Sequence, residues 1–173
     1  ALYVYATDAA LIAIDTLGLT PDIYGLYSMV PYFGAVISLT LVQRFGHRLT
    51  PRLTTLMSFA LIALASGAML VLFLFGELNP VVLFGATFVL IAGTMPLNVT
   101  YVTEAENTGA DRAVVAAMIS FLFMVASMVF VQVSGWMELL LGALGYPATL
   151  LMILAGLIVT FLAMVRDPRV TFL

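Results

Sequence analysis

The sequence predicts an all-α membrane protein, a bundle of six transmembrane helices with no soluble domain. Two observations carry this prediction: 64% of the 173 residues are hydrophobic, and only 9% are charged. Soluble domains average about 45–50% apolar and about 25% charged residues. A globule of this size would leave much of that apolar surface in water, so lipid is the solvent that fits the composition.

Six apolar segments approach the length of about 20 residues that a helix needs to cross a hydrocarbon core of about 30 Å. We expect them, within one domain spanning residues 1–173, at about residues 1–17, 21–43, 51–75, 80–103, 111–135 and 147–165. The first begins directly at Ala1 and is expected to be cut short. Trp136 and Tyr146 bound a less regular stretch, expected at headgroup level. Capping side chains followed by proline, a pattern typical of helix N-termini, precede three segments: Thr20-Pro21, Thr50-Pro51 and Asn79-Pro80.

The basic residues are asymmetric along the chain, which has no lysine. Six crossings would place all six arginines on one side: Arg44, Arg48, Arg52, Arg112, Arg166 and Arg169. The opposite loops hold Asp22, Glu77 and Glu138. By the positive-inside rule the arginine side is cytoplasmic. We therefore expect a multi-pass protein of the cell inner (plasma) membrane with a cytoplasmic C-terminus.

Asp8 is the most informative side chain. The first helix should end near Gly18, which places Asp8 about 15 Å below that surface, near the bilayer midplane. A carboxylate there is costly unless it is paired or protonated, so Asp8 is a candidate for proton coupling. The alternative is that Asp8 faces a water-filled cavity, or bonds a neighbour, without coupling anything. Asp15 is expected to be a water-exposed acid at the helix end.

Pro31 interrupts the second segment and must leave a backbone carbonyl to be satisfied by neighbouring groups. Kinks with aromatic neighbours are found in transport cavities and also in ordinary membrane helices. We take as substrate-cavity candidates Tyr5, Tyr27, Tyr32 and Gln132. Small residues four apart are expected to allow close helix packing: Gly34 and Ser38, Ala63 and Gly67, Ala116 and Ser120. Three methionines of the fifth segment are expected to serve simple packing: Met118, Met124 and Met128.

Charged residues on the arginine side fall in two neighbouring loops. Arg44 and Arg48 belong to the first, and Glu104 and Asp111 flank the second. An ion-pair latch between these loops would form a cytoplasmic gate. The alternative is that the arginines serve membrane topology alone.

Several functions are excluded by what the sequence lacks. It has no cysteine and one histidine, so it offers no thiolate or histidine metal cluster. It has no protease, phosphate-binding or dinucleotide-binding motif, and no basic patch for nucleic acid. We expect no enzyme activity, no metal and no cofactor.

Two stretches resemble the major facilitator superfamily of transporters. The run from Asp15 to Gly25 is similar to the junction between the first two helices of one half of such a protein. The loop from Gln43 to Arg48 is similar to the signature between its second and third helices. Arg44, Gly46 and Arg48 match that signature; Gln43 and His47 depart from it, as degenerate copies in the C-terminal half do. The stretch from Met95 to Ile119 looks most like multidrug-efflux members.

The resemblance covers essentially the whole chain and implies the C-terminal six-helix half of a twelve-helix transporter. It implies alternating access, with an N-terminal half as partner, protons as coupling ion, and efflux (antiport) of small apolar or cationic compounds. Two alternatives stay open. One is a half-size transporter that pairs with a second copy, and the other is a non-transporting scaffold or assembly subunit.

Overall fold

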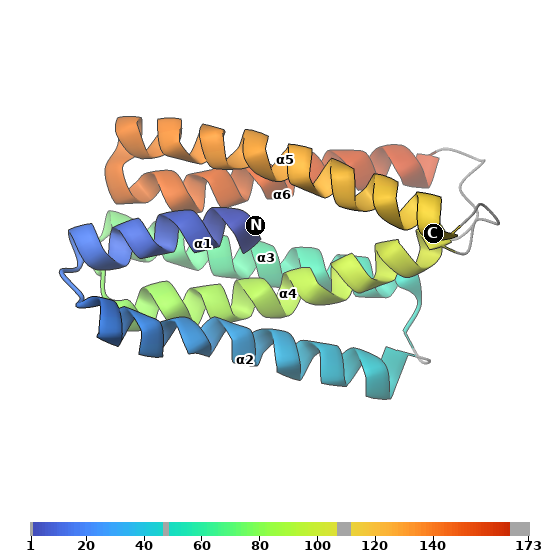
Figure 1. The fold of residues 1–173 in the computed structure, drawn as a ribbon, viewed down its shortest axis with the longest axis horizontal. Helices are drawn as coiled ribbons and strands as arrows, with labels where there is room; N and C mark the ends of the chain where they lie inside the picture. The colour runs from blue at the N-terminus through green and yellow to red at the C-terminus, as the bar shows by residue number, and fades with distance from the viewer. Residues whose placement is uncertain (1, 47–48, 107–111, 167–173) are drawn as a thin grey trace.

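A computed structural model describes residues 2–46, 49–106 and 112–166, and in these parts of the chain it contains helices and no strand. The helices lie side by side along the long axis of the molecule (Figure 1). In chain order they are α1 (Leu2–Leu11), the π-helical stretch η1 (Ile12–Thr16), α2 (Pro21–Phe45), α3 (Pro51–Leu74), α4 (Pro80–Glu106), α5 (Arg112–Leu141), the 3-10 turn η3 (Gly142–Leu144) and α6 (Gly145–Arg166).

Four helical runs are long and apolar enough to cross a membrane by length and composition: Pro21–Phe45, Pro51–Leu74, Pro80–Thr103 and Ala113–Ala163. The last run contains both α5 and α6, which fold back on one another at η3. Only 17% of the apolar window of α2 is buried in the bundle, and 0% of the window in the α5–α6 run. Apolar side chains that face outward on this scale suit lipid rather than water. The fold is thus an all-helical bundle suited to a membrane.

The turns follow the expected local chemistry with one exception. Thr50 caps α3, accepting a bond from the backbone N–H of Leu53 at 3.3 Å, and the Asn79 side chain accepts one from Val82 at 3.0 Å. The exception is Thr20, which precedes Pro21 of α2 in an extended conformation. Its side chain accepts no such bond from the described first turn of that helix. Gly18 ends the first helical stretch at φ 66°, a conformation that favours glycine.

One expectation about the end of the fifth segment is wrong. α5 does not stop near residue 135 but continues to Leu141, where Gly142 turns the chain at φ 59°. Tyr146, in the first turn of α6, is 0% exposed and is covered by the neighbouring helices. The physical reason is the close approach of α6 to α5 at Gly145, where a Cβ would fall within 3.0 Å of the backbone of Glu138. Glycine lets α6 begin inside the bundle.

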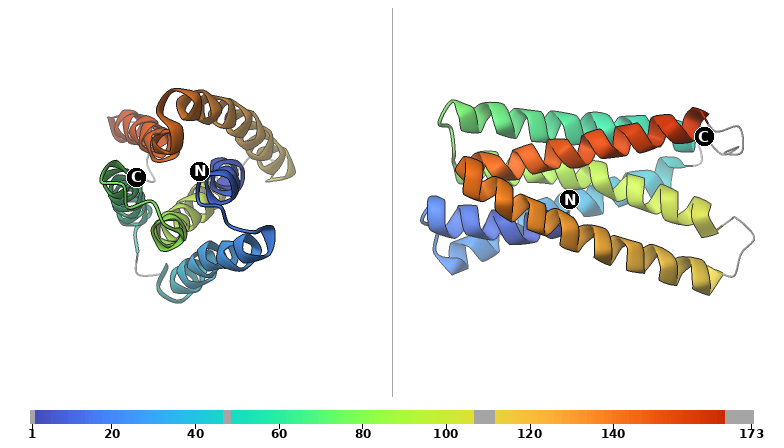
Figure 2. Two further views of the ribbon diagram at one scale, coloured as in Figure 1. Left: turned by 90° about the vertical axis from the view of Figure 1, so that its left-hand side faces the viewer. Right: turned by 90° about the horizontal axis from the view of Figure 1, so that it is seen from above.

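Most helix contacts join the first three helices of the chain, α1–α3, to the last three, α4–α6, and do not form within either set. α4 packs between α2 and α3, while α1 packs against α5 and, less extensively, against α4 and α6. α3 and α6 contact one another. The end-on view shows α1 among the other helices (Figure 2, left), and Figure 1 shows that α1 and α4 run in opposite directions.

The two ends of the bundle differ in charge. Four arginines lie where α2, α3, α5 and α6 begin or end on one side (Figure 1): Arg44, Arg52, Arg112 and Arg166. We call this side the arginine end. The opposite side, the acidic end, holds the turns after η1, α3 and α5, and with them Asp15, Asp22 and Glu77. Arg48 and Arg169 are outside the described residues.

Candidate functional site

Asp8 is buried inside the bundle and has a partner. Only 2% of its surface is exposed, and Ser134, which is 0% exposed, donates its hydroxyl proton to Oδ2 of Asp8. The two residues come from α1 and α5, which pack against each other. A carboxyl group in an apolar bundle needs such a donor when it is ionised, because no water replaces its hydration shell.

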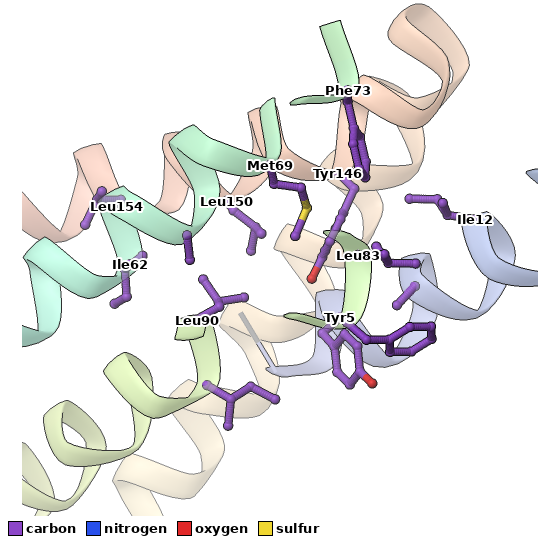
Figure 3. Close-up of a cluster of buried hydrophobic side chains, with 14 of the residues drawn as sticks. Tyr5, Ile12, Ile62, Met69, Phe73, Leu83, Leu90, Tyr146, Leu150 and Leu154 are labelled. Atoms are coloured by element: carbon purple, nitrogen blue, oxygen red, sulfur yellow. The ribbon is translucent and has the colours of Figure 1, made fainter. Parts of the chain in front are cut away.

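Two buried tyrosines lie close to this carboxyl group. Tyr5, one helical turn before Asp8, is 2% exposed, and Tyr146 of α6 is 0% exposed. Neither hydroxyl has a hydrogen-bond partner in the described part of the chain. Tyr146 interacts electrostatically with Asp8 and Tyr5, and its hydroxyl approaches Thr87 without reaching hydrogen-bond geometry. Figure 3 shows both tyrosines in the core cluster, the Tyr146 ring extending from α6 toward Leu83.

Glu138 is a second acid of this region, although the sequence predicts it in a loop. It lies on α5 one turn after Ser134, so both face the same side of that helix. Its Oε1 atom is buried and has no hydrogen-bond partner among the described residues. Its carboxyl group interacts electrostatically with Asp8. The spacing of four residues between Ser134 and Glu138 places both on one helix face, but only if the helix continues past residue 135, as α5 does to Leu141.

A pocket of about 250 Å³ connects Glu138 with the first helix near the acidic end. It is lined by Leu11, Ile12, Asp15, Thr16, Glu138, Gly142 and Ala143. Asp15 is exposed, as expected for an acid at a helix end. The η1 stretch supplies three of the lining residues, and π-helical turns are often found at functional sites.

The tyrosine candidates divide between two environments. Tyr27 is half-buried and stacks on Phe84 of α4, with 5.4 Å between ring centroids and 18° between planes. Tyr32 is exposed, one residue after Pro31, which is itself buried in an uninterrupted α2. Tyr5 interacts electrostatically with Tyr32 and with Tyr24. Tyr5 is thus buried while Tyr32 is exposed, and Tyr27 lies in the seam between α2 and α4.

Gln132 is separated from the Asp8 region. Its side chain is exposed on α5, whereas Ser134 is buried, so the two residues lie on different faces of that helix. Gln132 lines a groove of about 430 Å³ with Met124, Ser127, Met128 and Val131. The methionines of α5, for which simple packing is expected, are exposed within this chain: Met118, Met124 and Met128.

The gate candidates are described only in part. Arg44 is exposed in the last turn of α2, and Glu104 belongs to the last turn of α4, both at the arginine end (Figure 1). Arg48 and Asp111 lie outside the described residues.

The oxygen atoms near Asp8 belong to Ser134, Tyr146 and Glu138. No group of three or more histidine, cysteine, aspartate or glutamate side chains suited to a metal ion is found in the part of the chain that the structure describes. A carboxyl group held by one hydroxyl donor can bind and release a proton, and the change of charge would be felt by both tyrosines and by Glu138.

Comparison with known proteins identifies no relative: no protein family, no curated protein and no solved structure matches this chain.

Proposed function

We propose that this chain is a six-helix unit of a proton-coupled secondary transporter that exports small apolar or cationic compounds by alternating access. The observation that carries the proposal is Asp8, an acid buried between α1 and α5 in an otherwise apolar bundle. Ionisable groups inside membrane helices are costly and are found mainly on ion and proton pathways.

The interlocked packing supports the same proposal. α4 lies between α2 and α3, and α1 packs against α5 and α6, so each first helix of a triplet contacts the later helices of the other triplet. α1 and α4 run in opposite directions, as the first helices of two inverted repeats would (Figure 1). Secondary transporters are commonly built from inverted repeats, with substrate and ion sites near the midplane.

We further propose that the unit is the C-terminal half of a major facilitator superfamily transporter of the multidrug-efflux kind. An N-terminal half, or a second copy, would complete the substrate cavity. Tyr5 and Tyr32 interact electrostatically and would contribute to its wall, with Tyr27 supporting α2 through Phe84. Gln132 would contribute through the exposed groove on α5.

In this proposal the chain crosses the inner membrane six times, with the arginine end and the C-terminus in the cytoplasm. Arg44 and Glu104 lie at that end and, together with Arg48 and Asp111, would form the cytoplasmic gate.

The test is transport by the intact protein reconstituted in liposomes, with ethidium as the cationic aromatic probe and an imposed pH gradient as the driving force. We expect Asp8→Asn to abolish gradient-driven ethidium movement, because an amide cannot exchange a proton. Asp22→Asn is the matched control, since Asp22 is an exposed acid in the first turn of α2. Equal transport by the Asp8→Asn variant across pH would reject proton coupling through Asp8, and absence of transport in the wild type would favour a scaffold.

A further inference from the structure

Three carboxyl groups lie one after another in space between the acidic end and the middle of the bundle: those of Asp15, Glu138 and Asp8. Asp15 and Glu138 line the same pocket of about 250 Å³. Glu138 interacts electrostatically with Asp8, which lies on α1 two turns before Asp15. The pocket therefore leads from the exposed Asp15 to an acid that is in electrostatic contact with the buried one.

The inner end of this series has unsatisfied polar groups. Oε1 of Glu138 is buried without a partner in the described residues, and so is the hydroxyl of the fully buried Tyr146. Tyr146 interacts electrostatically with Asp8. Buried oxygen atoms left without partners are rare, because each costs free energy comparable to a lost hydrogen bond. A carboxyl oxygen in this position can be satisfied by binding a proton, and either oxygen by a hydrogen bond.

The geometry on both sides keeps these groups together. Gly145 lets α6 approach the backbone of Met137 and Glu138 closely, which fixes Glu138 beside the start of α6. On the other side, the π-helical η1 follows Asp8 after one turn of α-helix and contributes Ile12, Asp15 and Thr16 to the pocket wall.

The groups found to interact with Asp8 come from two elements, α5 with Ser134 and Glu138, and α6 with Tyr146. Tyr5 lies one turn before Asp8 on α1, and Tyr24 of α2 interacts with Tyr5 and Tyr146. Glu138 is the only carboxyl group of the described chain for which an interaction with Asp8 is found. No arginine or lysine side chain is found beside it in the described residues.

We propose that Glu138 is the relay acid that delivers protons from the pocket at Asp15 to Asp8. The inference rests on the proposed proton coupling and adds its entry route. A proton leaves the protonated carboxyl group of Glu138 and binds the carboxylate of Asp8, which leaves Glu138 ionised. Glu138 then takes a proton from water in the pocket, where the exposed Asp15 carboxylate attracts protons by its charge.

The test measures proton arrival at Asp8 and does not depend on a transported compound. The purified full chain in lipid nanodiscs is brought rapidly to lower pH, and the carboxyl C=O stretching band of Asp8 is followed by time-resolved infrared spectroscopy. The Asp8→Asn variant identifies the band by its loss. We expect Glu138→Gln to slow the rise of the Asp8 band by about tenfold or more, in line with the loss of a positioned proton donor. The final amplitude should be unchanged.

Glu77→Gln is the matched control, because Glu77 is an exposed acid at the same end that does not line the pocket. In the Glu77→Gln variant the Asp8 band should rise at the wild-type rate. Glu138→Asp keeps a carboxyl group and should restore most of the rate. Protonation of Asp8 at the wild-type rate in the Glu138→Gln variant would overturn the proposal, as would equal slowing in Glu138→Gln and Glu138→Asp. If wild-type protein moves no ethidium, the proposed transport fails, but the relay is still judged by these rates.

Discussion

The seam between α1 and α5 differs in kind from the seams that α4 makes with α2 and α3. At the first, a carboxyl group and a serine hydroxyl meet inside the bundle, next to tyrosine hydroxyls without partners. At the others, glycines allow close contact: Gly34 of α2 lies against Phe88 of α4, and Gly93 of α4 lies against Leu61 and Ser58 of α3. Tyr24 and Tyr27 complete the α2 seam by packing on Phe84.

The difference separates two ways of holding helices together in lipid. Small residues let backbones approach and gain dispersion contacts, whereas polar side chains gain a hydrogen bond that lipid cannot offer. Packing through small residues suits a fixed structural unit. The polar seam contains a carboxyl group whose charge can change, and any change of charge at Asp8 alters how α1 and α5 attract each other. Substitutions in each seam test this contrast.

The largest loss of stability is expected for Gly34→Ala. The new Cβ would lie 2.5 Å from the backbone carbonyl oxygen of Phe88, so α2 and α4 would have to move apart. We expect the free energy of unfolding to fall by about 3 kcal/mol, the upper range for overpacking. Chemical unfolding in mixed micelles, followed by circular dichroism, measures the change.

Gly67→Ala is the control for this substitution. No described atom lies within 4 Å of a Cβ at Gly67, so alanine should be neutral or stabilising by about 0.5–1 kcal/mol through helix propensity. An equal loss in both variants would show that the α2–α4 seam is not specially close-packed.

A smaller loss is expected for Ser134→Ala. The substitution removes the hydroxyl that bonds Asp8 and leaves a buried acceptor without its donor. We expect the free energy of unfolding to fall by about 2 kcal/mol at a pH where Asp8 is ionised, and by less when acid protonates Asp8. Unfolding curves at several pH values test both parts.

Ser127→Ala serves as the comparison within the same helix. Ser127 is half-buried and donates, in a solvent-exposed hydrogen bond, to the carbonyl oxygen of Phe123, one turn earlier, at 2.6 Å. Its removal should change stability little and without dependence on pH. A loss for Ser134→Ala that is constant across pH would assign Ser134 to packing instead of to Asp8.

The smallest effect is expected for Tyr27→Leu. Leucine keeps much of the apolar volume but loses the stacked contact with Phe84, which is worth about 0.5–1.5 kcal/mol beyond burial. Tyr32→Leu, at an exposed position on the same helix, should leave stability unchanged. The thermal unfolding midpoints of the two variants test this prediction. Equal midpoints would show that stacking on Phe84 adds no stability to the seam between α2 and α4.

Much of the helical layout could be predicted from local signals. The proline-led starts at Pro21, Pro51 and Pro80 coincide with the observed helix starts, since a capping residue and proline act within one turn. The fifth helix was predicted less well. The glycine at 135 was read as an end, whereas the surrounding apolar run carries α5 on to Leu141. A single glycine weakens a helix by about 1 kcal/mol and does not stop it.

For the candidate site, the sequence predicted only how far along its helix Asp8 lies. Counting residues placed Asp8 well inside the bundle, because the rise per residue of a helix is fixed. Counting does not show which way a side chain faces or which helix lies opposite. For that reason Gln132 was grouped with Asp8 although it is exposed on another face of α5, and Glu138 was left among the loop charges.

The sequence by itself determined that the chain is an apolar helical protein with its arginines at one end, because composition and hydropathy act through the solvent and along the local chain. The tertiary structure alone decided that Ser134 meets Asp8, that Tyr146 is buried, and that Glu138 shares a pocket with Asp15. These pairs join segments far apart in the sequence. Which helix faces join depends on how closely helices can approach, as at Gly34 and Gly145, and that is a property of packed surfaces rather than of any one segment.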